Sequence, residues 1–297
     1  MIGGFGKIPS KGDFVRVGHS DVTSRAFESW LDDACTRVRE AGLALPDASV
    51  RFVLRPAGSA EVCGGVLRPS SDAVGRQFPL SLFHMIAWSS AQPRWSGLPV
   101  LIDRFIESAD EVLRESALVG LDALRAGAAA LWTPGADDLA ATDQVCQRVL
   151  AVTPWRELAE RLFPPPVVDR AAYAFRTALL ACQRRDLAIA CPIETDVDLF
   201  FWLELFRRCA RDDAFGFVWV EEPAPRLIVS LGQPTTSMLL AIADPARESD
   251  QIWPLTTTRA AALEAAAVSM APVLEPIRDG AAPLGALLET LSRARIS

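Results

Sequence analysis

The sequence lacks any apolar run of the ~20 residues that a membrane-spanning helix requires. Its longer apolar stretches are interrupted by charged residues, by Asp122 and Arg125 in one and by Asp198 and Glu204 in another. The first fifteen residues have no uninterrupted apolar core of the kind that a signal peptide needs. We therefore expect a cytoplasmic protein that does not insert into a membrane.

Histidines are scarce and paired cysteines are missing. The chain has two histidines, His19 and His84, and six cysteines that form no Cys-x-x-Cys pair. Structural zinc sites use histidines or clustered thiolates, so we expect no metal site. His84 lies in an apolar run and is predicted to be a core residue, whereas His19 is predicted to be exposed in a loop. The cysteines lie among apolar residues, which indicates buried free thiols.

An excess of basic residues is also missing. The formal net charge is −7 and the isoelectric point is near 5.0, which argues against a nucleic-acid-binding surface. Half of the residues are apolar and 23% are charged, as is typical of globular proteins. A chain of 297 residues is long enough to bury a large core in one domain or two.

No sequence motif for catalysis is visible. There is no Gly-x-Ser-x-Gly nucleophile elbow. Acidic pairs such as Asp137 and Asp138 are adjacent, so their carboxylates point in different directions on a helix. We assign no catalytic residue and no cofactor, and we expect the protein not to be an enzyme.

The first fifteen residues are the most distinctive part of the sequence. They interleave four glycines and Pro9 with large apolar residues, which predicts a buried, sharply folded segment with a turn at Pro9. Gly4-x-Gly6-Lys7 is not a phosphate loop, because Met1 and Ile8 stand where that motif needs glycine and Ser or Thr. A dinucleotide fingerprint needs a strand before its glycines, and we expect no room for one.

Further along, hairpins of strands alternate with helices. This alternation predicts a mixed sheet with helices on both faces. Prolines 164–166 mark a possible internal boundary near 164–170, and the alanine-rich stretch 118–170 gives no clear assignment. The predicted strands are 50–54, 62–67, 78–88, 187–191, 215–220 and 226–231, and the predicted helices are 26–41, 99–113, 173–183, 197–208, 235–242, 259–274 and 284–293.

The opening stretch also resembles a known signature. Gly4-Phe5-Gly6-Lys7-Ile8-Pro9-Ser10-Lys11-Gly12-Asp13-Phe14 is similar to the start of TagF proteins, also called ImpM, which accompany bacterial type VI secretion systems. That family typically reads Gly, aromatic, Gly-Lys-Leu-Pro-Ser-basic-Gly-Asp-Phe. Further agreement lies at Trp30-Leu31, Phe52-Val53-Leu54-Arg55-Pro56, Gly65-Val66-Leu67-Arg68-Pro69-Ser70, Asp72-x-x-Gly75-Arg76-x-Phe78-Pro79-Leu80, Phe201-Trp202-Leu203-Glu204, Phe217-x-Trp219 and Pro225-Arg226-Leu227. Residues 118–185 match little of the family.

The resemblance implies a fold and a function. The fold would be a three-layer α/β/α sandwich with a mixed sheet, in one unit over residues 1–297. The function would be non-enzymatic, post-translational repression of type VI secretion assembly. Family members are described as engaging a scaffold protein that carries a forkhead-associated domain, which is the partner that the resemblance implies here.

An alternative role stays open for the motif, by which we mean the opening stretch 4–14 together with loop 68–76. Its charged residues in a glycine-rich loop could bind a small phosphorylated ligand or serve an enzyme, although charge pairs that hold a loop in place are more common. We expect the opening segment to pack beside loop 68–76. Asp13 and Asp72 could then pair with Lys7, Lys11, Arg68 or Arg76. The candidate residues for the motif or an interaction are Gly6, Lys7, Pro9, Lys11, Gly12, Asp13, Phe14, Arg68, Asp72, Gly75 and Arg76.

Overall fold

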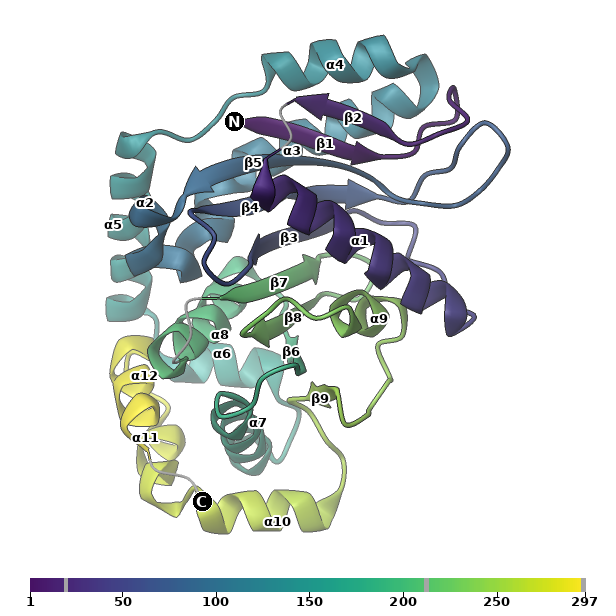
Figure 1. Ribbon diagram of the computed structural model, residues 1–297. Coiled ribbons are helices and arrows are strands. Elements are labelled where there is room, and N and C mark those ends of the chain that lie inside the picture. Colours follow the sequence, from purple (N-terminus) through teal and green to yellow (C-terminus); the bar gives the residue numbers. More distant parts are fainter. Residues whose placement is uncertain (19–20, 211–213, 295–297) are drawn as a thin grey trace.

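The computed structural model describes residues 1–18, 21–210 and 214–294 (Figure 1), with the backbone alone for residues 90–94, 276, 277 and 279. The fold is mixed α/β around one large sheet. The strands are β1 Ile2–Gly6, β2 Val15–Gly18, β3 Val50–Arg55, β4 Glu61–Arg68, β5 Leu80–Ala87, β6 Ala188–Pro192, β7 Phe215–Val220, β8 Arg226–Leu231 and β9 Ile252–Pro254.

The helices are distributed along the whole chain. Two short 3-10 helices, at Gln92–Gly97 and Ala271–Val273, accompany them. The α-helices are α1 Val22–Glu40, α2 Trp88–Ala91, α3 Leu98–Val119, α4 Leu121–Ala130, α5 Ala136–Val152, α6 Trp155–Leu162, α7 Val167–Ala181, α8 Asp196–Cys209, α9 Ser237–Ala243, α10 Ala260–Ser269, α11 Leu274–Asp279 and α12 Leu284–Arg293.

In the described residues the sheet has nine strands, in the order β2-β1-β5-β4-β3-β7-β8-β6-β9. Neighbouring strands are antiparallel except β6 and β9, which run parallel, so the predicted mixed sheet is confirmed. The predicted hairpins are present as β3–β4 and β7–β8. Because β3 pairs with β7, one sheet extends across the sequence on both sides of prolines 164–166. The division into domains stays a prediction.

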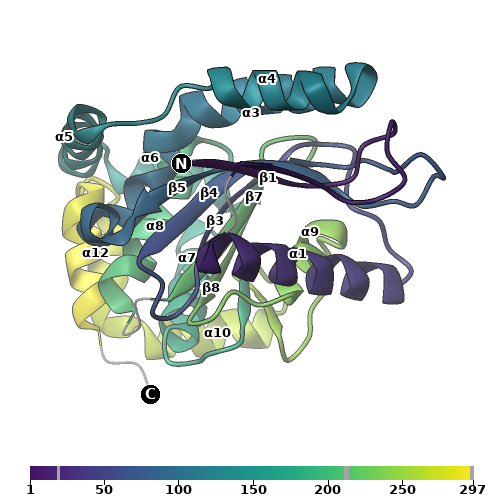
Figure 2. The same ribbon diagram turned by 45° about the horizontal axis from the view of Figure 1, so that its top comes forward.

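Side chains of the two sheet faces enter different hydrophobic cores. Alternation along β3 sends Val53 to one core and Phe52 and Leu54 to the other, as the two-residue period of a strand requires. The core that contains Val53 includes apolar side chains of α3, α7, α8 and α12, and the other is completed by α1 and α9. Figure 2 shows α3 and α4 on one side of the sheet and α1 and α9 on the other. The three-layer description of the whole chain stays a prediction.

The opening residues differ from the sequence-based prediction. We expected a folded loop without room for a strand, and this was wrong, because Ile2–Gly6 forms β1 between β2 and β5. Glycine has a low strand propensity, which hid the strand. Here Gly3 lies directly against the ring of Phe83, whose nearest carbon would be 2.4 Å from an added Cβ. The glycines therefore leave space for a large side chain of the neighbouring strand.

Several helix boundaries also differ. Helix α1 begins at Val22, four residues before the predicted start, because Asp21 and Ser24 form reciprocal capping bonds of 2.7 and 2.8 Å. Strand β5 ends at Ala87, and the predicted strand residue Trp88 begins α2. The unassigned stretch 118–170 is mainly helical, with α4, α5 and α6.

Within the described parts of the chain, no helix is both long enough and apolar enough to cross a membrane.

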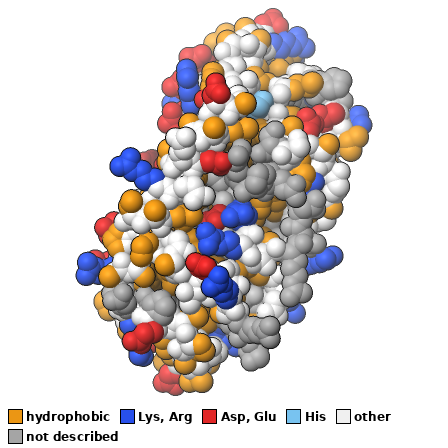
Figure 3. Space-filling model, turned by 90° about the vertical axis from the view of Figure 1, so that its left-hand side faces the viewer, with side chains coloured by type: hydrophobic (Ala, Val, Ile, Leu, Met, Phe, Trp, Pro, Cys, Tyr) orange, Lys and Arg blue, Asp and Glu red, His pale blue; other side chains and the backbone are white. Residues whose placement is uncertain are grey.

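The end of the molecule formed by α5 and α12 has no single charge character in the view of Figure 3. Basic and acidic side chains are interspersed there with apolar ones. The predicted motif lies elsewhere, at the end of the sheet from which the loops after β1 and β4 project (Figure 1).

Candidate functional site

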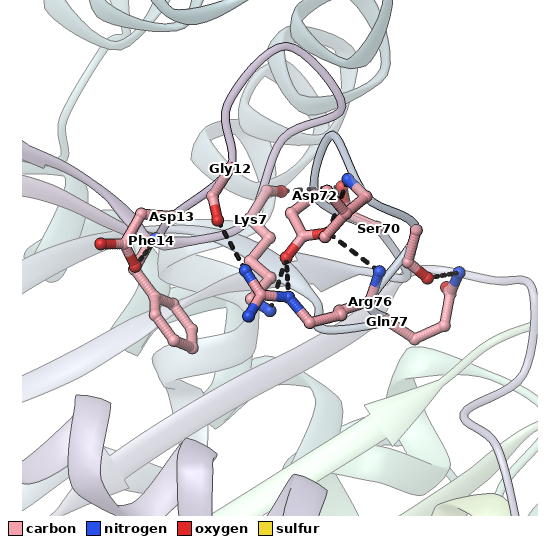
Figure 4. Close-up of polar contacts among 10 residues, drawn as sticks. Lys7, Gly12, Asp13, Phe14, Ser70, Asp72, Arg76 and Gln77 are labelled. Atoms are coloured by element: carbon pink, nitrogen blue, oxygen red, sulfur yellow. Dashed lines mark hydrogen bonds and ion pairs between the residues drawn. The ribbon is translucent and has the colours of Figure 1, made fainter.

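The candidate site joins two loops that are distant in sequence, residues 7–14 after β1 and residues 69–79 after β4. Lys7 Nζ donates to Asp72 Oδ2 at 2.9 Å, and both residues are buried, with exposed fractions of 7% and 3%. Two further hydrogen bonds support this ion pair: Ala73 N donates to Lys11 O at 2.8 Å, and the Ser70 hydroxyl Oγ donates to Lys7 O at 2.8 Å. The predicted contact between the opening segment and loop 68–76 is confirmed (Figure 4).

Glycine and proline shape the first loop. Gly6 has φ +145°, and an added Cβ would lie 2.1 Å from Pro79 O, so no larger residue fits without movement of the backbone. Pro9 follows, and Lys11 N donates to Ile8 O at 3.1 Å. This places Pro9 at the second position of a four-residue turn, where its fixed φ is favourable. The chain therefore leaves β1 sharply and returns toward β2.

Asp72 is the centre of the second loop. Its Oδ1 accepts from the backbone N–H groups of Val74, at 3.1 Å, and Arg76, at 2.9 Å. Burial by itself would raise the pKa of Asp72, but the hydrogen bonds from Lys7, from Arg76 and from the backbone of Val74 outweigh burial and hold that pKa well below its usual range. Asp72 is therefore a carboxylate whose oxygens are already occupied by the protein.

Arg76 extends this network to the first loop. Its Nε donates to Asp72 Oδ2 at 2.6 Å, and its Nη2 donates to Gly12 O at 2.6 Å. The side chain is nevertheless 62% exposed. Arg76 thus ties the two loops together with one edge of its guanidinium group while part of that group stays accessible to solvent (Figure 4).

Three phenylalanines pack beneath the charged network. The rings of Phe5 and Phe14 are stacked with centroids 5.1 Å apart, and Phe14 meets the edge of Phe78 at 4.8 Å. Lys7 Nζ lies 5.1 Å from the centroid of Phe14, within the range of a cation–π contact. An apolar floor under Lys7 and Asp72 keeps the ion pair away from water.

The other predicted site residues have different positions. Lys11, Gly12 and Asp13 are exposed, and Asp13 Oδ1 accepts from Phe14 N at 2.7 Å. Gly12 has open space around it, and its φ lies outside the left-handed region. Gly75 does have positive φ, at +85°.

Arg68 does not join the cluster. We expected it as a possible partner of Asp13 or Asp72, but Arg68 Nη1 donates to Ser49 Oγ at 2.7 Å and to Asp110 Oδ1 at 3.1 Å. These residues line a polar cleft of about 730 Å³ between β3, β4 and α3. The side chain of Arg68, at the end of β4, is directed to that cleft by its place on the strand.

One signal in the sequence was missed. Lys7 and Lys11 are the only two lysines of the chain, and the other 28 of the 30 basic residues are arginines. A lysine reaches a single carboxylate as a compact charge on a flexible stem, whereas arginine presents a wide planar fork. The buried position of Lys7 against Phe14 and Asp72 suits that shape.

A groove beside the motif was also not predicted. It has a volume of about 460 Å³ and lies between the end of α1 and the segment around Phe78. The sequence could not have indicated it, because its walls come from residues 35–45 and 69–79 and meet only in the fold.

The two histidines and the groups that could bind a metal were also the subject of predictions. His84 is buried in β5, as predicted, and its pKa is lowered to about 4, first by burial and then by the charge of the chain's N-terminus. His19 lies outside the described residues. In the described ranges 1–18, 21–210 and 214–294, no three His, Cys, Asp or Glu residues are grouped so that they could hold a metal ion.

Comparison with known proteins gives three findings. Residues 3–131 match the model of the TagF N-terminal domain, which is described as type VI secretion system-associated. This match spans both loops of the candidate site. No curated protein matches the chain significantly.

A crystal structure of PA0076 from Pseudomonas aeruginosa PAO1 has a similar fold. It aligns with a TM-score of 0.51 and 18% sequence identity, over 86% of this chain and 99% of that chain. At this identity the likeness concerns the fold alone. It extends beyond residue 131 into the second half of the chain.

Proposed function

We propose, from the membership of residues 3–131 in the TagF N-terminal domain family, that this type VI secretion system-associated protein is a non-enzymatic, post-translational repressor of secretion-system assembly. It acts in the cytoplasm by binding a scaffold protein that carries a forkhead-associated domain. Occupying a surface of the scaffold prevents the scaffold from recruiting other components. The effect therefore depends on stoichiometry and not on turnover.

The observation that carries this proposal is that the charged groups of the motif pair with one another within the protein. Lys7 and Asp72 are buried against each other, and Arg76 ties them to the first loop. A group that is committed to such bonds in the folded protein supports the shape of a loop better than it supports a reaction. The motif then serves to hold the two loops in a fixed shape.

A second candidate function is favoured by one observation. Arg76 is partly exposed and Lys11 is exposed at the same end of the sheet, so two cations could hold the phosphate of a small ligand. The Arg76→Ala variant separates the two functions. If Arg76 holds the loop, melting temperature and repression fall together; if it holds a phosphate, folding survives and activity is lost.

Lys11→Ala gives a second comparison, because Lys11 makes its contact to Ala73 through the backbone. The repressor function predicts full activity for Lys11→Ala, as for Arg25→Ala, which removes an exposed arginine from α1. Phosphate binding predicts a loss for Lys11→Ala and none for Arg25→Ala.

The experiment for the proposed function is graded overproduction of the full chain in a host with an active type VI system. Secreted tube protein is measured in culture supernatant, with the cellular levels of secretion components measured beside it. We expect secretion to stop as the protein reaches the level of its scaffold partner, while component levels stay constant. Unchanged secretion at high levels of folded protein would refute the repressor function.

A further inference from the structure

The groove beside the motif has an apolar interior. Its walls are the end of α1 with the loop that follows, and the segment between β4 and β5. Eight of its twelve lining residues are apolar, namely Cys35, Val38, Leu43, Ala44, Leu45, Pro69, Phe78 and Pro79. A volume of about 460 Å³ lies within the range of about 300–1,000 Å³ that is usual for ligand-binding pockets.

The charged side chains among those lining the groove are both basic. Arg39 lies in the last turn of α1 and is exposed, and Arg76 lies on the opposite wall. The chain as a whole carries a net charge of −7. An apolar groove with a cationic rim on an acidic molecule favours a ligand that combines apolar groups with negative charge.

The wall that carries Arg76 is held in place by the motif. Asp72 anchors that loop to Lys7, and Ser70 anchors it through Lys7 O. Phe78 N donates to Ser70 O at 3.0 Å, and the Phe78 ring packs into the core below. A groove that is already formed loses little conformational entropy when a ligand enters it.

We propose that this groove binds a short extended segment of a partner protein, with two or three neighbouring apolar side chains and an Asp or Glu carboxylate. The apolar side chains enter between Leu45 and Phe78, and the carboxylate pairs with Arg39 or Arg76. A free phosphate would contact the rim and leave the apolar walls unused. The inference rests on the proposed function only in taking the occupant to be a protein.

The test begins with phage-displayed random 12-residue peptides selected on the immobilised full chain. Peptides that also bind the Leu45→Asp variant are removed, since this substitution places a carboxylate in the groove. We expect the enriched sequences to share neighbouring apolar residues and an Asp or Glu. Enrichment of basic sequences, or no enrichment, would overturn the proposal.

The affinity of an enriched peptide is then measured by fluorescence anisotropy with matched variants of the protein, which shows where the peptide binds. Leu45→Asp and Arg39→Glu are expected to weaken binding at least tenfold. Leu118→Asp, at a position that is 89% exposed at the end of α3, and Arg25→Glu on α1 serve as controls and are expected to have no effect. Replacing the peptide's acidic residues by lysine is expected to restore binding to Arg39→Glu. Equal binding by the groove and control variants would overturn the proposal.

Two further measurements separate this inference from others. If wild-type protein dimerises with increasing concentration and Leu45→Asp does not, the groove belongs to a second copy and the proposal is overturned. If Leu45→Asp, folded as judged by its melting temperature, still captures the scaffold protein, the groove fails while the proposed function stands. If peptides bind as expected and the scaffold is not captured, the groove stands and the proposed function fails.

Discussion

Lys7 and Asp72 are 65 positions apart in sequence, yet Lys7 Nζ donates to Asp72 Oδ2 at 2.9 Å in a buried ion pair. Removing one member of such a pair leaves the other charge buried without its partner, which costs more than the pair contributes. The two loops that this pair joins contain Lys7 to Phe14 of the opening stretch and Asp72 to Pro79. Their contact explains why lysine, aspartate and glycine occur together in the motif.

The two glycines of the motif are expected to differ in their tolerance of alanine. Gly6→Ala places a Cβ 2.1 Å from Pro79 O at φ +145°, and the backbone conformation alone costs about 1–3 kcal/mol. Gly12→Ala meets open space and is expected to stay within about 0.5 kcal/mol of wild type. The measurement is urea unfolding of both variants. Equal destabilisation of the two variants would contradict the conclusion that the backbone at the end of β1 leaves no room for a side chain at position 6.

The stability of the protein is expected to depend on pH through His84. The pKa of His84 is lowered to about 4 in the fold, against an ordinary value of about 6.5. The unfolded chain therefore binds a proton below pH ~6.5 that the folded chain does not bind, so stability decreases as pH falls from 6.5 to 4. The loss is at most about 3 kcal/mol, and above pH ~6.5 His84 contributes no pH dependence.

The control for this effect is His84→Gln, which cannot take up a proton in that range. The difference in unfolding free energy between wild type and His84→Gln should widen in favour of the variant as pH falls from 6.5 to 4. His19 and the carboxylates are present in both proteins, so their contributions to the pH dependence cancel in this difference. Parallel pH profiles for the two proteins would show that His84 is not buried in neutral form.

The second half of the chain is expected to depend on a buried aspartate. Asp198 near the start of α8 accepts from Arg161 Nε at 3.1 Å and from the backbone of Glu194 and Thr195 at 2.9 Å. Asp198→Ala leaves these donors without an acceptor, at a cost of about 3–5 kcal/mol. Asp196→Ala, an exposed position on the same helix, is expected to cost well below 1 kcal/mol. Similar melting temperatures for the two variants would contradict this result.

Elements with clear periodicity could be predicted from the sequence. Strands 215–220 and 226–231 and helix 284–293 occur where the patterns placed them, because alternating or helically spaced apolar residues determine which face is buried. The contact between the opening segment and loop 68–76 could also be predicted, since each contains turn residues and opposite charges.

Other features depended on contacts that a single sequence does not specify. Strand β1 was not predicted because it contains glycines, and Gly3 is needed there to leave space for the ring of Phe83 on a neighbouring strand. The partner of Arg68 was missed because Asp110 lies on α3, 42 positions away. The groove beside Phe78 arises only when α1 is placed against the loop after β4.

The most direct test of the central claim, that the motif is a buried tie between two loops, uses the two lysines. The native protein is treated briefly with an amine-acylating reagent, and mass spectrometry of the peptide covering residues 1–16 compares Lys7 with Lys11. Lys7 is 7% exposed and paired with Asp72, whereas Lys11 is exposed. We predict that Lys11 is acylated at least tenfold faster and that Asp72→Asn narrows this difference. Equal acylation of Lys7 and Lys11 in the folded wild-type protein would contradict the account.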